Sequence, residues 1–225
     1  MLLQQRIWPL SERSKRDFIM TTTHYKRFRM EIDLQKFPPE QKELPEGYMW
    51  MPWSIRLLDM HARTKKACFE YEIDAHVFPC LAELTGCRKL MRDMASRSTF
   101  VPEATWLVLK EAGDDQPVEH CGTIQGIHTG YQFGAIQNVG IVPEHRGHGL
   151  GKLLVLQSLH GFLKRGVKTV SLEVTAQNTK AVRLYHSIGF RIVKTLYKTA
   201  KGPVPKPRPK PSAAPEEPAI TGAAT

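Results

Sequence analysis

A glycine-rich turn between an expected strand and an expected amphipathic helix constrains the fold more than any other feature of this sequence. The run from Arg146 to Lys152 carries glycines at positions 147, 149 and 151. Glycine lacks the Cβ atom that would hold a ligand away from the main chain, and the N–H groups at a helix N-terminus attract anions. The segment therefore predicts a diphosphate-binding turn, to which Arg146 and Lys152 add positive charge.

The glycine spacing separates this turn from two other phosphate-binding motifs. It does not follow the G-x-G-x-x-G pattern of a dinucleotide-binding unit, and it lacks the G-K-[ST] ending of a P-loop. A plain alternative stays open, in which the glycines only allow the strand and the helix to pack closely.

The surrounding residues predict an α/β (α+β) domain with a mixed central β-sheet flanked by helices. We expect strands at 25–34, 105–109, 119–128, 134–142, 170–175 and 191–198. We expect helices at 54–69, 78–96, 149–165 and 179–187, and a turn-rich connection at 37–52. On the third of these helices, apolar residues recur on one face and polar residues on the other.

The two ends of the chain differ in composition from its middle. We expect residues 1–19 to be a flexible extension, with Met20 as the natural start, and residues 20–200 to form the domain. Residues 201–225 contain seven of the sixteen prolines and almost no large apolar side chain, so we expect a disordered tail.

Composition limits the classes of function. The net charge of +10 is concentrated at the two ends, so nucleic acid is an unlikely partner, while a basic balance suits a phosphorylated cofactor. No apolar run approaches the length of a membrane span. The four cysteines form no CxxC pair, so we expect reduced thiols, no metal site and a cytoplasmic protein.

Two separate segments carry motifs. With a conservative change at its first position, the pattern V-x-P-x-x-[QR]-x-x-G-x-[GA] is matched by Ile141, Pro143, Arg146, Gly149 and Gly151. A later segment runs from Asn178 through Tyr185 to Gly189 and Phe190. Together the two segments resemble the two signature motifs of the GNAT superfamily of N-acetyltransferases.

The resemblance implies a GNAT fold over roughly residues 105–198 and acetyl-CoA as the co-substrate, with no metal. The strand ending at Ile141 and Val142 would offer main-chain groups to the pantetheine arm, and the turn would hold the pyrophosphate. The implied cofactor-binding residues are Ile141, Val142, Arg146, Gly147, His148, Gly149, Leu150, Gly151, Lys152 and Asn178. Asn178 is also expected to cap the helix that follows it.

Tyr185 occupies the position from which family members often protonate the leaving thiolate, so it is the candidate general acid. The expected helix places Tyr185 on the same face as Ala181, Leu184 and Ile188, pointing inward. The alternative is a core tyrosine whose hydroxyl is satisfied by a neighbour.

Glu173 is the candidate general base. It lies on a strand expected to be central, where burial would raise the pKa of its carboxyl group. In ribosomal-protein N-terminal acetyltransferases, the glutamate that acts as the general base lies at a similar sequence distance before the residues that match Asn178 and Tyr185. The alternative is a buried structural ion pair with Arg183 or Arg191.

Other polar residues make weaker candidates. His145 and His148 flank the turn and are expected to be solvated or close to phosphate. Gln137 and Asn138 lie where some family members place an acid or a histidine, but an amide cannot act as a base. His120 and Cys121 are neighbours on a strand and therefore face opposite sides, so they cannot form a nucleophile–base pair.

The resemblance implies direct attack by a primary amine in a ternary complex, without a covalent enzyme intermediate. The acceptor is an amine-bearing small molecule or a peptide N-terminus. A cationic acceptor would need carboxylates at the mouth of the site, which Glu70, Glu72 and Asp74 could supply. A non-catalytic acyl-CoA-binding module is the main rival, and the sequence leaves a homodimer open.

Overall fold

A computed structural model of the 225-residue chain describes residues 22–111 and 117–201. The predictions for residues 1–19, and for the tail beyond Lys201, lie outside the described residues. The strands are β1 (Thr22–Asp33), β2 (Tyr48–Pro52), β3 (Phe100–Lys110), β4 (Glu119–Gly130), β5 (Phe133–Ile141), β6 (Thr169–Thr175) and β7 (Arg191–Lys201). The α-helices are α1 (Leu58–Phe69), α2 (Ile73–Val77), α3 (Leu84–Ala95), α4 (Leu150–Lys164) and α5 (Thr179–Ile188).

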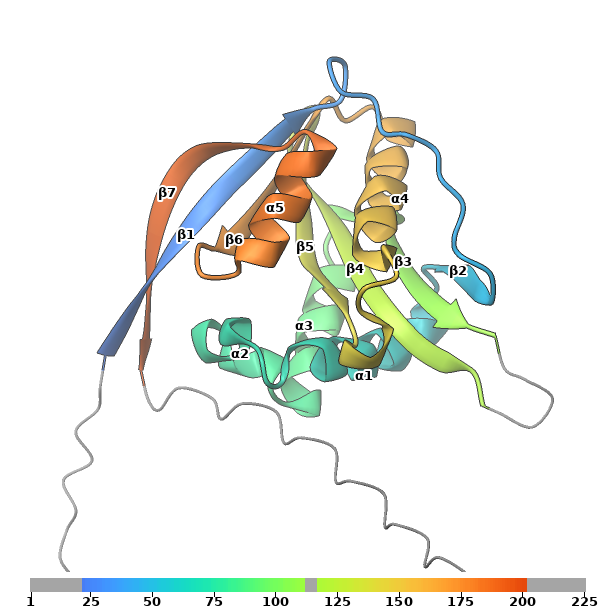
Figure 1. The fold of residues 1–225 in the computed structure, drawn as a ribbon, viewed down its shortest axis with the longest axis horizontal. Helices are drawn as coiled ribbons and strands as arrows, with labels where there is room; N and C mark the ends of the chain where they lie inside the picture. Colours follow the sequence, from blue (N-terminus) through green and yellow to red (C-terminus); the bar gives the residue numbers. More distant parts are fainter. Residues whose placement is uncertain (1–21, 112–116, 202–225) are drawn as a thin grey trace, which may run out of the picture.

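The seven strands form one mixed sheet in the order β2-β3-β4-β5-β6-β1-β7. Every neighbouring pair is antiparallel except β5 and β6, which run parallel. The predicted mixed sheet is therefore confirmed. The first strand pairs between the last two, so Thr22 and Lys201, the two ends of the described chain, lie side by side (Figure 1).

The parallel pair in the middle of the sheet is short. Phe133 pairs with Thr169, Gly134 with Val170 and Ala135 with Ser171, and the pairing then stops although both strands continue. Figure 1 shows β5 and β6 separating below this point. The sheet thus has a gap at its centre, and main-chain groups along that gap lack a partner strand.

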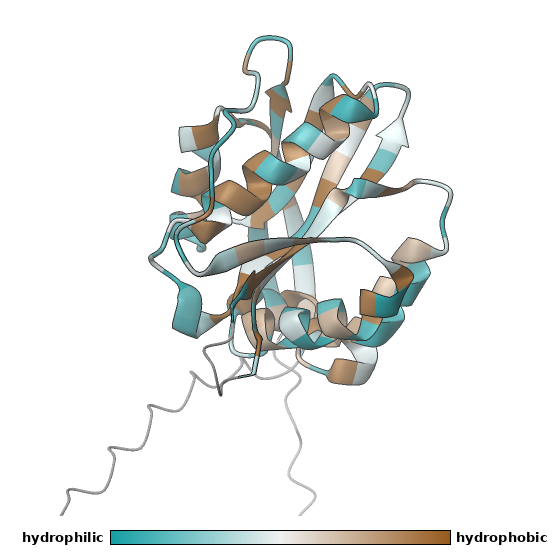
Figure 2. Cartoon of the chain, turned by 90° about the vertical axis from the view of Figure 1, so that its right-hand side faces the viewer, coloured by the Kyte–Doolittle hydropathy of each residue, from teal (hydrophilic) through white to brown (hydrophobic). Residues whose placement is uncertain are grey.

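Helices cover both faces of the sheet. The α4 helix packs on β3, β4 and β5, while α1 packs on β4 and β5 from the other side. Phe162, Leu159 and Leu154 of α4 are fully buried in the main core. Figure 2 shows apolar residues concentrated where helices and strands meet, and hydrophilic residues in the loops.

A close approach fixes α4 against the sheet. A Cβ atom at Gly161 would lie 1.9 Å from the main-chain oxygen of Glu103 on β3, so no other residue fits there without displacing the helix. One turn earlier, the Ser158 hydroxyl donates a hydrogen bond of 2.8 Å to the Ala104 carbonyl. These contacts fix the C-terminal half of α4 on β3.

Most predicted elements are confirmed within a few residues, and three differences have physical reasons. The predicted turn-rich connection at 37–52 ends in β2, a short edge strand with Pro52 at its end. The predicted helix at 78–96 is divided, because Pro79 opens a 3₁₀ turn and Glu83 is extended before α3 begins. The α2 helix has five residues, too few for a helical pattern to show in the sequence.

Candidate active site

The predicted phosphate turn lies between β5 and α4 with its main-chain N–H groups free. The amides of residues 147–151 donate no hydrogen bond to any described residue. Gly147 and Gly149 have φ angles of +90° and +77°, and nothing lies within 4 Å of a Cβ atom built on either. The left-handed conformation and the open space explain why glycine is needed there. Consecutive free amides at a helix N-terminus make a site for an anion.

The surroundings of Gly151 differ from those of Gly147 and Gly149. It lies in the first turn of α4, and a Cβ atom on it would contact Leu184 of α5 at 3.5 Å. That distance is an ordinary van der Waals contact, so the packing of α4 and α5 does not require glycine at this position. In this turn the structural need for glycine lies at Gly147 and Gly149, where φ is positive.

Arg146 ties the turn to the end of α1 instead of pointing into the open space above the amides. Its guanidinium donates to the Ile141 carbonyl at 3.0 Å, to the Cys68 carbonyl at 3.1 Å and to Glu72 at 2.7 Å. Five N–H donors on a rigid plane make arginine suited to such a junction. Arg146 lies at the turn, as predicted, but the Glu72 carboxylate partly neutralises the charge of its guanidinium.

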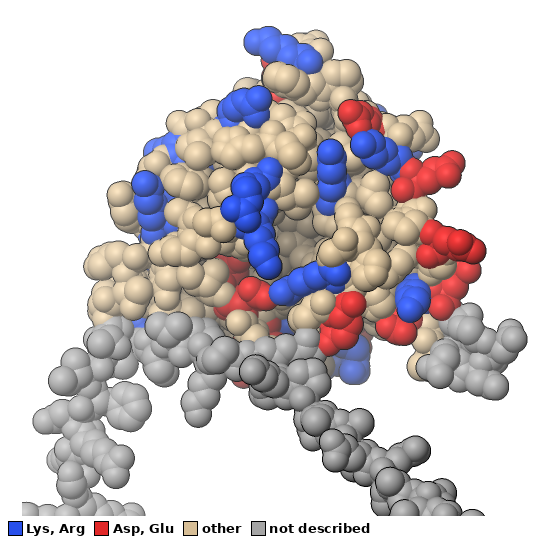
Figure 3. Space-filling view, viewed as in Figure 1, with Lys and Arg blue, Asp and Glu red and all other residues tan. Residues whose placement is uncertain are grey.

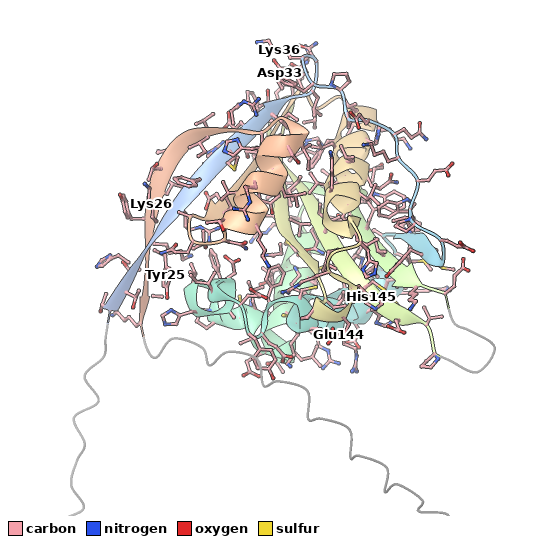
Figure 4. The ribbon with its side chains drawn as sticks, in the orientation of Figure 1. Tyr25, Lys26, Asp33, Lys36, Glu144 and His145 are labelled. Carbon is pink, nitrogen blue, oxygen red and sulfur yellow. The ribbon has the colours of Figure 1, made fainter. Side chains whose placement is uncertain are left out.

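His145 anchors the turn from behind. Its Nε2 lies 2.7 Å from a Glu119 oxygen on β4, and its Nδ1 lies 3.1 Å from the Tyr48 hydroxyl on β2. Figure 4 places His145 on the segment between β5 and α4. Of the two expectations for His145, solvation is wrong because the residue is buried, whereas a place close to phosphate stays a prediction, since His145 lines the pocket above the turn. His148 is exposed, as expected, and its ring lies tilted 6.1 Å from that of Tyr48.

A pocket of about 470 Å³ opens directly above the turn. It brings together most of the residues predicted to bind the cofactor: Ile141, Arg146, Gly147, Gly149, Leu150, Gly151, Lys152 and Asn178. Val142 and His148 do not line it. The Val142 side chain is buried, and its N–H donates to the Cys121 carbonyl at 2.9 Å.

Lys180 lines this pocket too and was absent from the predicted site. With Lys152 it places two ammonium groups beside the free amides, and Figure 3 shows basic side chains around the hollow on this face. The signal was available, because Lys180 lies in the first turn of the helix that Asn178 was expected to cap. The pocket therefore has the size and the charge to take a polyphosphate.

Asn178 caps α5 as predicted. Its side-chain oxygen accepts a hydrogen bond of 3.2 Å from the Ala181 N–H. Because Asn178 also lines the pocket, its amide nitrogen stays available to a ligand. The cap and the ligand contact predicted for this residue are therefore compatible.

Tyr185 points inward from α5, as predicted. It is 7% exposed and packs edge-on against Phe190, but its hydroxyl has no hydrogen-bond partner among residues 22–111 and 117–201. Burial raises the pKa of the phenol well above its ordinary value, and the nearby Asp74 carboxylate acts in the same direction. The proton therefore stays on Tyr185 at neutral pH, as a general acid requires.

A narrow passage leads from this pocket through the gap between β5 and β6. Tyr185, Asn178 and Val139 line both the pocket and the passage. Beyond the gap, a second pocket of about 570 Å³ shares Glu173, Asn138 and Leu172 with the passage. The pocket, the passage and the second pocket therefore adjoin one another in a row from the glycine turn, past Tyr185 and Glu173, to the opposite face of the sheet.

Glu173 stands at the far end of the passage, but it is not buried. Its side chain is 48% exposed, and an oxygen lies 3.6 Å from the Arg27 Nε. The expected burial is wrong because Glu173, although its strand lies inside the sheet, faces a pocket of about 570 Å³ and not a packed helix. The ion pair anticipated with Arg183 or Arg191 is also wrong, since the partner is Arg27 on β1.

The three carboxylates expected at the mouth of the site are each bound to a basic residue. Glu70 pairs with Lys66, and Glu72 pairs with Arg146. Asp74 lies 3.4 Å from Arg27 and accepts a hydrogen bond of 2.9 Å from the Thr175 hydroxyl. None of the three is a free anionic group for a cationic ligand.

A lysine absent from the predictions is fully buried beside the passage. The Nζ of Lys65 on α1 donates a hydrogen bond of 3.2 Å to the Asn138 side-chain oxygen. Asn138 has a φ angle of +49° and lies in a bulge of β5, where the pairing with β4 is interrupted. Asparagine tolerates this conformation better than most residues. The sequence did carry a signal for this burial, because helical spacing places Lys65 on the same face of α1 as the apolar Ala62 and Phe69.

The described residues give no sign of a metal centre or a membrane span. Among residues 22–111 and 117–201, no three His, Cys, Asp or Glu side chains are grouped so that they could hold a metal ion. In the same part of the chain, no helix has both the length and the apolar character that crossing a membrane needs. All four cysteines are free thiols.

Comparison with known families and structures agrees with this geometry. The family model described as "Acetyltransferase (GNAT) family" matches residues 67–190. A GCN5-related N-acetyltransferase from Sphaerobacter thermophilus superposes with a TM-score of 0.58 and 22% identity, over 84% of this chain and 54% of that one. The agreement confirms the expected GNAT fold.

Curated relatives match over shorter segments. A mycothiol acetyltransferase from Nocardia farcinica is 38% identical over 104 residues, which is 44% of this chain and 34% of the relative. One from Thermobifida fusca is 40% identical over 67 residues, which is 30% of this chain and 21% of the relative. The chain thus spans about a third of the length of the first relative and about a fifth of the second.

We expect the replacement Lys65→Met to change how stability depends on pH. Burial lowers the pKa of Lys65 to about 7 in the folded chain, whereas an unfolded lysine has a pKa of about 10.4. Between these values the unfolded chain binds more protons, so rising pH favours the folded wild-type protein. Relative to the variant, it should gain up to about 1.4 kcal/mol per pH unit in this window.

Urea unfolding of both proteins at about pH 7 and about pH 9.5 measures this difference. Lys164→Met, at an exposed position on α4, is the matched control and should show no such trend. If the stability difference between wild type and Lys65→Met is the same at both pH values, the lowered pKa of the buried Lys65 is contradicted.

Proposed function

Because the chain belongs to the GNAT acetyltransferase family, we propose that it transfers an acetyl group from acetyl-CoA to a primary amine in a ternary complex. The observation that carries the proposal is the row of adjoining pockets that leads through the sheet. It has free amides at one end, an open pocket at the other, and Tyr185 and Glu173 along the passage between them. Two substrates entering from opposite faces would meet where the strands separate.

The turn fits the donor substrate. The free amides of residues 147–151 would hold the pyrophosphate, while Lys152 and Lys180 would neutralise further phosphate charge. The unpaired edge of β5 near Ile141 would bind the amides of the pantetheine arm, with Asn178 on the other side. When bound, the donor supplies an activated acetyl thioester.

Tyr185 would supply the proton that the leaving thiolate needs. It lies on the wall shared by the donor pocket and the passage, and its hydroxyl has no competing partner among the described residues. Burial keeps the phenol protonated until a strong base forms beside it.

Glu173 would accept the proton that the attacking amine loses. It lines both the passage and the far pocket, so it stands beside the path of an incoming amine. Its partial exposure allows transfer directly or through one water molecule. Arg27, 3.6 Å away, would hold the carboxylate in position.

A small amine suits the far pocket, whose volume of about 570 Å³ falls in the usual range for small-molecule sites. The N-terminus of a peptide is the alternative acceptor, since the pocket lies between strands β1, β5 and β6 and the segment from Phe78 to Leu90, where an extended chain end could enter. The free cysteines support a reducing compartment, which we propose to be the cytoplasm.

The proposal predicts that purified protein releases free thiol from acetyl-CoA when a suitable amine is present. A panel of amines, amino acids and short peptides, followed with a thiol-reactive dye, measures this release. Mass spectrometry of the products should show addition of one acetyl group to the amine. Cofactor binding without thiol release from any acceptor would instead favour a non-catalytic acyl-CoA-binding module.

Replacing Gly149 by Val should abolish donor binding while the fold persists. A β-branched residue is strained at a φ of +77° and would narrow the access to the free amides. We expect the Kd for acetyl-CoA, measured by isothermal titration calorimetry, to rise by at least about 30-fold, equivalent to about 2 kcal/mol.

Gly47→Val is the matched control, because Gly47 has nearly the same φ, +76°, and also nothing within 4 Å of a built Cβ atom. It imposes similar backbone strain at the turn before β2. Equal affinities for the two variants would show that the glycine turn does not hold the donor.

Replacing Tyr185 by Phe should lower kcat by about 100-fold, the usual size of a general-acid contribution. The ring and its packing against Phe190 are kept, so the affinity for acetyl-CoA should change little. Tyr131→Phe, at a tyrosine that is 88% exposed, is the control and should leave kcat unchanged. A Tyr185→Phe enzyme with the wild-type rate would remove Tyr185 from the mechanism.

A further inference from the structure

The pocket on the acceptor side combines an apolar wall with one open cation. Phe78, Leu81, Leu90 and Phe133 form the apolar part of the lining. The charged side chains in the lining are Arg27, Arg29 and Glu173, so guanidinium groups outnumber carboxylates there. The carboxylates on the donor side already have basic partners and add no free negative charge.

The two arginines differ in what they can offer a ligand. Arg27 is buried: it donates to Thr175 at 2.9 Å, lies near Asp74 and Glu173, and has its guanidinium over the Phe78 ring. Its donors are directed at the protein, so it supports Glu173 and the α2 segment.

Arg29 is more available. Its one ion pair among the described residues is with Glu31, through Nε at 3.0 Å, and its side chain is 42% exposed. The two terminal nitrogens of this guanidinium make no hydrogen bond within the described residues. These nitrogens carry most of the donors that bind a carboxylate in a bidentate way.

Arg29 and Glu173 are direct partners in the pairing of β1 with β6, so their side chains leave the same face of the sheet. Cβ atoms of such partners lie about 5 Å apart. The pocket floor therefore presents a carboxylate next to the passage and a guanidinium beside it. A molecule with an amino group and a carboxylate a few bonds apart matches this pair of charges.

We propose that the acceptor is an amine that also carries a carboxylate, such as an α-amino acid or short peptide with an apolar side chain. This inference rests on the proposed acetyltransferase function and names its substrate class. Glu173 receives the amino group, Arg29 binds the carboxylate, and the apolar wall takes the side chain. A polyamine lacks the anionic group and meets Arg29 with a like charge.

With these roles, each bond and each proton in the acetyl transfer is accounted for. The neutral acceptor nitrogen forms a bond to the acetyl carbon, and the bond from that carbon to sulfur breaks. One proton leaves the nitrogen toward Glu173, and one proton reaches the sulfur from Tyr185. Glu173 then releases its proton to solvent and Tyr185 takes one up from solvent, which restores the enzyme for the next turnover. The products are an N-acetylated amino acid and free coenzyme A.

The experiment compares matched acceptors that differ in the carboxylate. Leucine and phenylalanine are tested beside their amides and beside isoamylamine and phenethylamine, their decarboxylated counterparts, with thiol release as readout. We expect kcat/KM to be at least about 10-fold higher for the acids, the value of one charge-assisted pair. Equal or better turnover of the amines and amides would overturn the proposal.

Arg29→Met tests the residue. It should lower kcat/KM for the acids by about 10- to 100-fold and leave the amides and amines unchanged. Arg29→Lys should restore part of the preference, because the charge returns without the fork of donors. Lys26→Met is the matched control: Lys26 is exposed on the other side of β1 from Tyr25, whose hydroxyl bonds His76 (Figure 4).

The outcomes separate the two proposals. Thiol release with amines, but no preference for acids, contradicts the substrate class and leaves the acetyltransferase function standing. An Arg29→Met variant that loses activity on acids and amines alike contradicts the specific contact with a carboxylate. Absence of thiol release with every acceptor defeats the acetyltransferase function itself.

Discussion

The parallel pairing between β5 and β6 stops after Ala135 and Ser171, and the site depends on that stop. Main-chain groups beyond it have no partner strand, although buried N–H and C=O groups need one. A substrate arm with amide groups can fill that role. The separation of the strands also opens the passage by which the two faces of the sheet communicate, so one irregularity provides both a binding edge and a channel.

The separation is held open by side chains from distant parts of the chain. On one side, Tyr185 of α5 and Asn178 at its N-cap line the gap. On the other, the bulge at Asn138 turns β5 away, and the buried Lys65 bonds to that residue. Helix α1 thus contacts β5 directly through Lys65, and α5 borders the gap between the strands.

Features set by residues close together in the chain could be predicted from the sequence. The glycine turn, the Asn178 cap and the inward face of α5 depend on a few neighbouring positions, and the structure agrees with each. The alternating strands and helices of the domain were predictable for the same reason. Short elements such as β2 and α2 were not, because a pattern needs several repeats to show.

Features set by distant partners could not be predicted. Glu173 looked like a buried carboxylate, but its environment depends on Arg27, which β1 brings alongside β6 from far along the chain. The burial of His145 could not be predicted either, because its partners, Tyr48 and Glu119, lie on two other strands. The balance of positive and negative side chains in the proposed acceptor pocket could not be predicted either, because it depends on the same pairing of distant residues.

The anchoring of His145 has a consequence for how the proposed donor substrate would associate. A glycine-rich segment left to itself samples many conformations, and ordering it on binding would consume contact free energy. Here the bonds to Tyr48 and Glu119, with the Arg146 contacts to α1, already restrict the segment when the chain folds. The turn is therefore preorganised, and more of the phosphate contact energy is retained as affinity.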